Sequence, residues 1–122
     1  MITAFEDACR EHIQALNRRG KLPATYDRIG AWWRGAQEID LVGLADEGEI
    51  LLAECKWSTR PVGTDVLAAL AKKTGHLLAD ADMKAPRTRF ALFSRSGYTP
   101  DLLRQARAES VLTFDVADVL RA

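Results

Sequence analysis

The chain has 122 residues, of which 48% are apolar and 28% charged, and these are ordinary values for one globular domain. Lysine plus arginine number 17 and aspartate plus glutamate also number 17, so the net charge is zero and the strongly basic character of many nucleic-acid-binding domains is absent. Cys9 and Cys55 lack a Cys-x-x-Cys spacing, which argues against a disulfide framework and favours a cytoplasmic location. No apolar run approaches the roughly 18 residues of a transmembrane helix, so no membrane association is expected.

The first predicted element is an amphipathic helix from Ile2 to about Arg18. Its apolar stripe has helical spacing and consists of Ile2, Phe5, Cys9, Ile13 and Leu16. Glu6 lies at the edge of this stripe. It is either a half-exposed surface residue, which is the commoner case, or a carboxylate that faces the sheet. His12 lies inside the stripe and is expected to be a hydrogen-bonded core residue rather than a metal ligand.

A strand is predicted from Tyr26 to Trp33. Side chains alternate along a strand, so Trp32 and Trp33 point to opposite faces and the strand is expected to be covered on both sides. Packing in the core or at its rim is the expected role of the two indoles. A stacking platform for nucleic-acid bases is the alternative.

Two apolar runs at 37–45 and 50–57 flank an acidic, glycine-containing turn, a pattern that predicts a β-hairpin. Glu54 and Lys56 share one face of the second strand, and the alternation places four side chains on one face of the first: Glu38, Asp40, Val42 and Leu44. An unpaired charge on a buried strand costs several kcal/mol, so these charges need partners or a metal. Carboxylates and a lysine on neighbouring strands suit a hard divalent cation. The alternative without a functional site is a partly exposed Glu54–Lys56 ion pair, which would contribute about 0–1 kcal/mol to stability.

The second half of the chain predicts alternating helices and strands. A helix is expected from about Thr64 to about Ala79, and Lys73 beside its apolar stripe either reaches the sheet edge or, more commonly, snorkels at the surface. A strand at 87–94 follows it and should run parallel to 50–57. Thr99-Pro100-Asp101 is a helix start, and a short strand at 111–114 and a final helical turn after Asp115 complete the chain. This order predicts a mixed sheet flanked by helices.

The order α-β-β-β-α-β, with Asp40 on one strand and Glu54-x-Lys56 on the next, resembles the PD-(D/E)XK nuclease superfamily. A more specific set of motifs resembles the nuclease-like domain at the C-terminus of certain archaeal and bacterial AAA/STAND-type ATPases. This set consists of Phe5-Glu6, Arg28-Ile29-Gly30, Trp32-Trp33, Glu38-Ile39-Asp40, Glu54-Cys55-Lys56-Trp57, Pro61-Val62-Gly63 and Ser94-x-x-Gly97-Tyr98-Thr99. The likeness runs from about Phe5 to Thr99. Ile39 stands where the superfamily name has proline, and the chain contains no Gly-x-x-x-x-Gly-Lys loop of its own.

The resemblance implies one restriction-endonuclease-like α/β domain over 1–122 with an αβββαβ core, and the activity of a metal-dependent DNA endonuclease. Asp40 and Glu54 would bind Mg²⁺ or Mn²⁺, Lys56 would orient or activate the attacking water, and Glu6 would be an auxiliary acid. Accessory roles are expected for Lys73 and Glu38. Contacts with nucleic acid are expected from Arg28, Arg34, Trp32 and Arg95.

The implied partners are DNA, an AAA/STAND-type ATPase domain in cis or in trans, and a second copy of the chain where both strands of a duplex are cut. A non-catalytic nuclease-fold module that binds DNA or a protein is the alternative function. The zero net charge favours this alternative slightly. The joint presence of Asp40, Glu54 and Lys56 favours the enzyme more strongly, because a binding module has no need of all three.

Overall fold

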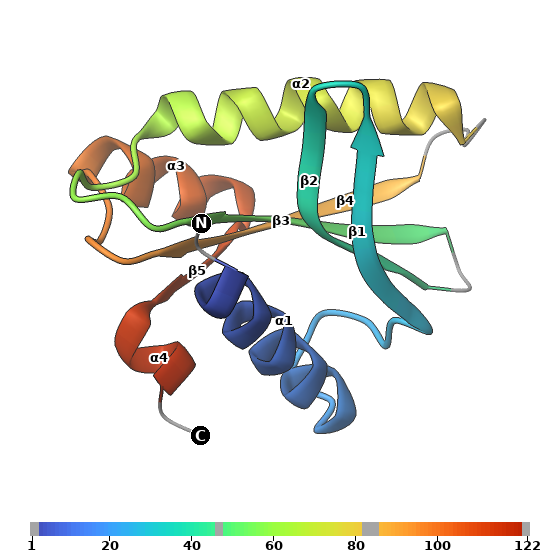
Figure 1. Cartoon of the computed structure of the whole chain (residues 1–122), viewed down its shortest axis with the longest axis horizontal. Helices are drawn as coiled ribbons and strands as arrows, with labels where there is room; N and C mark the ends of the chain where they lie inside the picture. The colour runs from blue at the N-terminus through green and yellow to red at the C-terminus, as the bar shows by residue number, and fades with distance from the viewer. Residues whose placement is uncertain (1–2, 46–47, 82–85, 121–122) are drawn as a thin grey trace.

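The computed structural model describes residues 3–45, 48–81 and 86–120. It contains a five-stranded mixed sheet in the order β1-β2-β3-β4-β5, flanked by helices (Figure 1). The strands are β1 (Arg28–Arg34), β2 (Gln37–Leu44), β3 (Glu49–Lys56), β4 (Arg87–Ser94) and β5 (Leu112–Asp115). The helices are α1 (Thr3–Arg18), α2 (Thr64–Asp80), α3 (Pro100–Glu109) and α4 (Val116–Leu120). The predicted element order and fold class are confirmed, although residues 46–47 of the predicted hairpin turn lie outside the described part.

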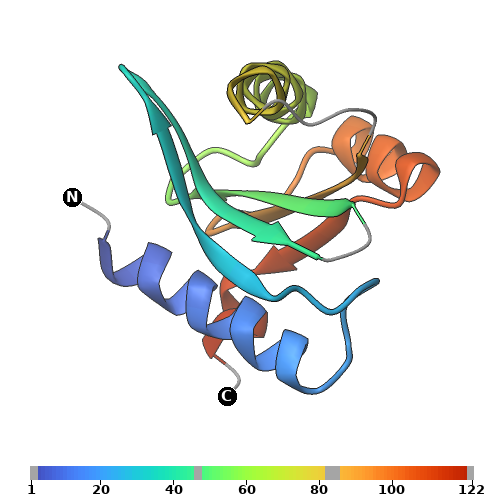
Figure 2. The ribbon, with the colours of Figure 1, turned by 90° about the vertical axis from the view of Figure 1, so that its right-hand side faces the viewer.

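The sheet has two antiparallel and two parallel strand pairs. β1, β2 and β3 are joined in antiparallel order, and β3, β4 and β5 pair in parallel, as the helical connections require. α1 and α4 cover one face and α2 and α3 the other (Figure 2). Each face has its own apolar core, and β3 contributes to both, which explains why almost the whole strand is buried. None of the described helices is long and apolar enough to cross a bilayer.

Two further sequence predictions are confirmed, and one is refined. Thr99 caps α3 by accepting a hydrogen bond from the backbone N–H of Leu102 at 3.1 Å. Cys9 on α1 and Cys55 on β3 are buried free thiols, as expected without a disulfide framework. His12 is half-buried, with its ring packed edge-on against Phe93 and Phe114.

The prediction that β1 is covered on both faces is wrong. β1 is an edge strand, and most of its residues are exposed. Trp32 packs against the core beneath α2, but 67% of Trp33 is accessible to solvent. The alternation assigned the two indoles to opposite faces correctly. It did not reveal that none of the described helices covers the side on which Trp33 lies.

The predicted face of Glu38 and Asp40 is also wrong. The register of β1 against β2 shifts between the pairs Gly30↔Val42 and Trp32↔Ile39, so β2 carries one extra residue at this point. Such a bulge interrupts the alternation of side chains. Ile39 therefore joins Val42 in the core beneath α2, and Glu38 and Asp40 are turned away from that core.

Gly43 on β2 leaves the space that the ring of Tyr26 occupies. A Cβ atom at position 43 would lie 3.1 Å from the Tyr26 ring, and Tyr26 is only 3% exposed. We expect Gly43→Ala to lower the free energy of unfolding by about 1–3 kcal/mol, because a buried ring would have to shift. Urea denaturation followed by circular dichroism would measure this. Gly30→Ala is the matched control, since a Cβ there meets nothing within 4 Å; equal effects of the two changes would contradict the prediction.

Candidate metal centre

The candidate site forms where β2 leaves β3. The two strands pair from Leu44↔Ile50 to Leu41↔Ala53, and the β1–β2 hairpin then curves away from the rest of the sheet (Figure 2). Just past the last pair, Oδ2 of Asp40 accepts a hydrogen bond of 2.8 Å from the backbone N–H of Cys55. The side chain thus replaces the strand carbonyl that would otherwise satisfy this N–H. The bulge in β2 and this bond together fix the direction of the Asp40 carboxylate.

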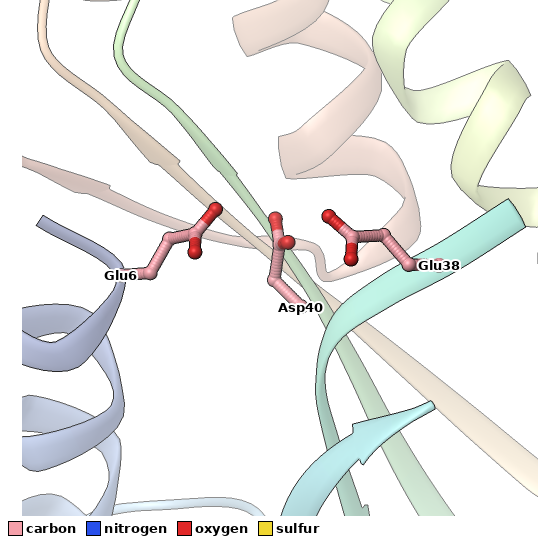
Figure 3. A group of neighbouring side chains, drawn as sticks. All are labelled: Glu6, Glu38 and Asp40. Carbon is pink, nitrogen blue, oxygen red and sulfur yellow. The ribbon is translucent and has the colours of Figure 1, made fainter. Parts of the chain in front are cut away.

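Three carboxylates converge at this point. Oxygen atoms of Glu6, Glu38 and Asp40 all lie within 4.8 Å of one another. Figure 3 shows Asp40 between the other two, with Glu6 approaching from α1 and Glu38 from β2. The sequence left two alternatives for Glu6, a surface residue or a carboxylate that faces the sheet. The structure shows the second. Hard divalent cations bind carboxylate oxygens of this kind.

Burial and the neighbouring carboxylates both shift the pKa of Glu6. Burial raises the pKa of Glu6 above its usual value, and the negative charges of Asp40 and Glu38 raise it further. A bound cation would reverse this electrostatic effect, because it would favour the ionised form of each carboxylate. The donor set and its electrostatics therefore fit a metal such as Mg²⁺ or Mn²⁺.

Glu54 lies beside this group and is held by a lysine. Glu54 is 6% exposed. Nζ of Lys73 on α2 donates to Oε1 of Glu54 at 2.6 Å and to the backbone carbonyl of Glu38 at 2.8 Å. Burial raises the pKa of Glu54 to about 7; the bond from Lys73 opposes this shift and nearby Asp40 adds to it. Lys73 thus ties β2, β3 and α2 together at the site.

Of the two expectations for Lys73, the structure shows the one in which the side chain reaches the sheet edge. Its position indicates why, since Leu70 and Leu77 precede and follow it on the side of α2 that packs against the sheet. The Glu54–Lys56 ion pair, which the sequence left as the alternative to a metal site, is not the contact that forms; Glu54 pairs with Lys73 instead. Lys56 is half-buried and lines a pocket of about 250 Å³ with Arg60 and Asp65 at the start of α2.

The four residues predicted to contact nucleic acid do not gather on one surface. Arg28 and Trp32 line a pocket of about 690 Å³ between the β1–β2 hairpin and the end of α2. Arg34 pairs with Asp80 at 3.6 Å, and the Arg95 guanidinium lies 4.7 Å from the centre of the Trp57 ring. Arg28 is at the end of the sheet where β3 begins, whereas Arg95 follows the last residue of β4.

A second buried cluster, which the sequence did not reveal, lies at the far end of the sheet. Glu49 is 4% exposed and accepts a hydrogen bond of 2.9 Å from the Tyr26 hydroxyl. Arg87 and Arg89 lie 4.0 and 3.8 Å from its carboxylate. The cluster compensates one buried charge and fastens the segment before β1 to the sheet, which indicates a structural role.

Solved structures with a similar fold include nucleases. A repair endonuclease from Pyrococcus abyssi matches with a TM-score of 0.54 and 16% identity, over 89% of this chain and 45% of the endonuclease chain. A complex of EndoMS with double-stranded DNA matches with a TM-score of 0.46 and 17% identity, over 87% of this chain and 43% of the EndoMS chain. The five-stranded mixed sheet flanked by helices thus resembles the fold of restriction-endonuclease-like nucleases.

Sequence comparison extends these findings. An uncharacterized protein of Methanocaldococcus jannaschii is 41% identical over 54 residues, which are 43% of this chain and 12% of the archaeal protein. The chain therefore matches only a small part of that relative. The family DUF234, described as archaea bacterial proteins of unknown function, matches residues 1–74. This segment includes α1, the strands β1, β2 and β3, and the first part of α2. All the residues of the candidate metal centre lie within that segment, and the chain belongs to the DUF234 family.

Proposed function

We propose that this domain is a metal-dependent DNA endonuclease that hydrolyses phosphodiester bonds. The observation that carries the proposal is the convergence of Glu6, Glu38 and Asp40, within 4.8 Å of one another, on a nuclease-like fold. Three ionised carboxylates this close repel one another, and a divalent cation would remove that cost. Asp40 would be the central ligand, because its neighbours approach it from both sides (Figure 3).

Each residue of the site has a role under this proposal. Asp40 and Glu54 would hold Mg²⁺ or Mn²⁺, and Glu6 and Glu38 would supply further oxygens directly or through water. The metal would lower the pKa of bound water and neutralise charge on the phosphate. Lys73 would keep Glu54 oriented. Lys56 would meet the scissile phosphate or the attacking water with a compact positive charge.

The partners follow from the same proposal. DNA would be the substrate, and a homodimer would allow both strands of a duplex to be cut. The motif resemblance implies that an ATPase domain of the AAA/STAND type would act with the nuclease domain in cis or in trans. The match covers 12% of the archaeal relative, so that relative has room for further domains. Residues 1–122 would then be one nuclease-like domain of a larger assembly.

A second candidate function is a nuclease-fold module that binds DNA or protein without turnover. The observation that favours it is the short ion pair between Lys73 and Glu54, since a carboxylate engaged by lysine is less available to a metal. Metal binding separates the two candidates, because the binding module does not require it.

The first test combines cleavage and metal binding. Plasmid, junction and flap DNA would be incubated with the protein and Mg²⁺ or Mn²⁺, with EDTA as the control, and Mn²⁺ binding would be measured by calorimetry. We expect cleavage that EDTA abolishes. The absence of both cleavage and metal binding would contradict the proposal and favour the binding module.

Metal binding should also stabilise the fold. At a free metal concentration of 100 times the dissociation constant, the free energy of unfolding should rise by about 2.7 kcal/mol, because the metal binds the folded state. Thermal denaturation with increasing Mn²⁺ would show this as a rising midpoint. Glu11→Gln removes an exposed acid of α1 outside the carboxylate group and is the control; loss of the metal effect in that variant would indicate unspecific binding.

A further inference from the structure

Trp33 is the most exposed large apolar side chain in the described part of the protein. Its exposed fraction is 67%, against 39% for Trp57 and 39% for Leu103. Most large apolar groups on this chain are buried in one of the two cores. An indole left in water on an edge strand therefore invites a functional explanation.

The indole of Trp33 is held against the candidate metal centre. Its Nε1–H donates a hydrogen bond of 3.0 Å to Oε2 of Glu38, one of the three converging carboxylates. This bond restricts the ring at its polar edge. The ring therefore presents a pre-oriented apolar surface directly beside the carboxylates, at little further entropic cost for a ligand.

Trp57, directly after β3, is the other exposed indole, but its surroundings differ from those of Trp33. The ring of Trp57 packs against Phe5 with centroids 4.8 Å apart, and the Arg95 guanidinium lies 4.7 Å from its centre. Among the described residues, Glu38 is the partner found for the Trp33 side chain, and neither a ring nor a cation lies over it. The ring of Trp33 is thus the one available for stacking.

We propose that Trp33 stacks on an unpaired DNA base next to the bond that is cleaved. This inference rests on the proposed nuclease function and specifies its substrate class as DNA with a single-stranded segment. A base inside a duplex is stacked on its neighbours, so its flat face is accessible to an indole only when the base is unpaired. The surrounding charge also favours a base, because the neutral ring of a nucleobase avoids the repulsion that Glu38 would exert on a phosphate.

The test measures DNA binding in the full chain, separately from the cleavage assay described above. Fluorescence anisotropy of labelled oligothymidylate and of a labelled duplex of the same length would be compared for the wild type and Trp33→Ala. Stacking on an aromatic side chain contributes about 1–3 kcal/mol per base, so Trp33→Ala should weaken single-strand binding between about 5-fold and about 150-fold. Duplex binding should change much less. The intrinsic Trp fluorescence should be quenched by oligothymidylate in the wild type and less so in the variant.

Two further variants separate stacking from other effects. Trp33→Phe keeps an aromatic ring but loses the bond to Glu38, so it should retain most single-strand affinity. Leu103→Ala removes another exposed apolar side chain, on α3, and should leave binding unchanged. Thermal denaturation of all variants should give similar midpoints, because Trp33 is exposed.

The outcomes distinguish this inference from the proposed function. Unchanged single-strand binding in Trp33→Ala, or equal losses for single strand and duplex, would overturn the stacking role even if the protein cleaves DNA. Loss of self-association in Trp33→Ala, with DNA binding intact, would instead assign the indole to a protein interface. Failure of metal-dependent cleavage with selective single-strand binding would leave stacking supported and the nuclease proposal contradicted.

Discussion

Asp40→Asn is expected to lower metal-dependent DNA cleavage by about 1,000-fold or more, since a metal ligand contributes several kcal/mol of transition-state stabilisation. The amide keeps the size of the side chain and can still accept the bond from the Cys55 N–H. It removes the central negative charge of the carboxylate group. Initial rates on the best DNA substrate, with Mg²⁺ and Mn²⁺, would measure the effect.

The same substitution provides an internal control on folding. Without metal, Asp40→Asn should be at least as stable as the wild type, because repulsion with Glu6 and Glu38 is relieved. Mn²⁺ should no longer raise its unfolding temperature. Wild-type cleavage by Asp40→Asn would contradict the proposed metal site. Loss of both cleavage and folded structure in Asp40→Asn would instead indicate a structural role for Asp40.

Lys73→Met is expected to destabilise the metal-free protein at pH 8 by about 2 kcal/mol, because it leaves the buried Glu54 without its partner. Methionine retains much of the apolar length of lysine, so the loss is mainly electrostatic. The figure lies below the usual cost of breaking a buried pair because Glu54 can take up a proton. Urea denaturation at a series of pH values would measure the effect.

The sign of the pH dependence follows from the raised pKa of Glu54. Its pKa is about 7 in the folded protein and 4.5 by the ordinary value, so protonation of Glu54 favours the folded state. This contribution is fully present below pH 4.5 and is lost as the pH rises through about 7. Lys73 lowers the pKa of Glu54, so without Lys73 the stability continues to fall above pH 7 and the total loss is larger.

Lys73→Met should therefore have little effect on stability at pH 5 and its largest effect above pH 7. Combining Lys73→Met with Glu54→Gln should recover most of the lost stability at pH 8, because no charge is then buried. Lys72→Met is the matched control, since the neighbouring Lys72 is exposed on α2. A destabilisation by Lys73→Met that is the same at pH 5 and pH 8 would contradict this account.

Much of the fold was predictable because its signals are local. The spacing of Phe5, Cys9 and Ile13 determines α1, and the order of the elements determines that β3 and β4 are parallel. The charges on the hairpin also indicated where a site would form. Asp40 and Glu54 stood out because charged residues on a buried strand are costly without a partner.

The composition of the site depended on tertiary structure. One extra residue in β2 shifted the register, and the simple alternation then placed Glu38 and Asp40 on the wrong face. The approach of Glu6 depended on how α1 packs against the sheet, and the contact of Lys73 depended on the position of α2. These are contacts between residues far apart in sequence, and local patterns carry little information on them.

The sequence by itself thus determined the element order, the mixed sheet and the strands that carry the charges, because periodicity and turn chemistry act over a few residues. Only the tertiary structure decided which carboxylates meet, that Lys73 rather than Lys56 contacts Glu54, and that Trp33 stays in solvent. The physical reason is that a bulge, an edge position and helix packing set the directions of side chains. The bulge arises from strand pairing within the β1–β2 hairpin, and the edge position and the helix packing arise from contacts between segments far apart in sequence.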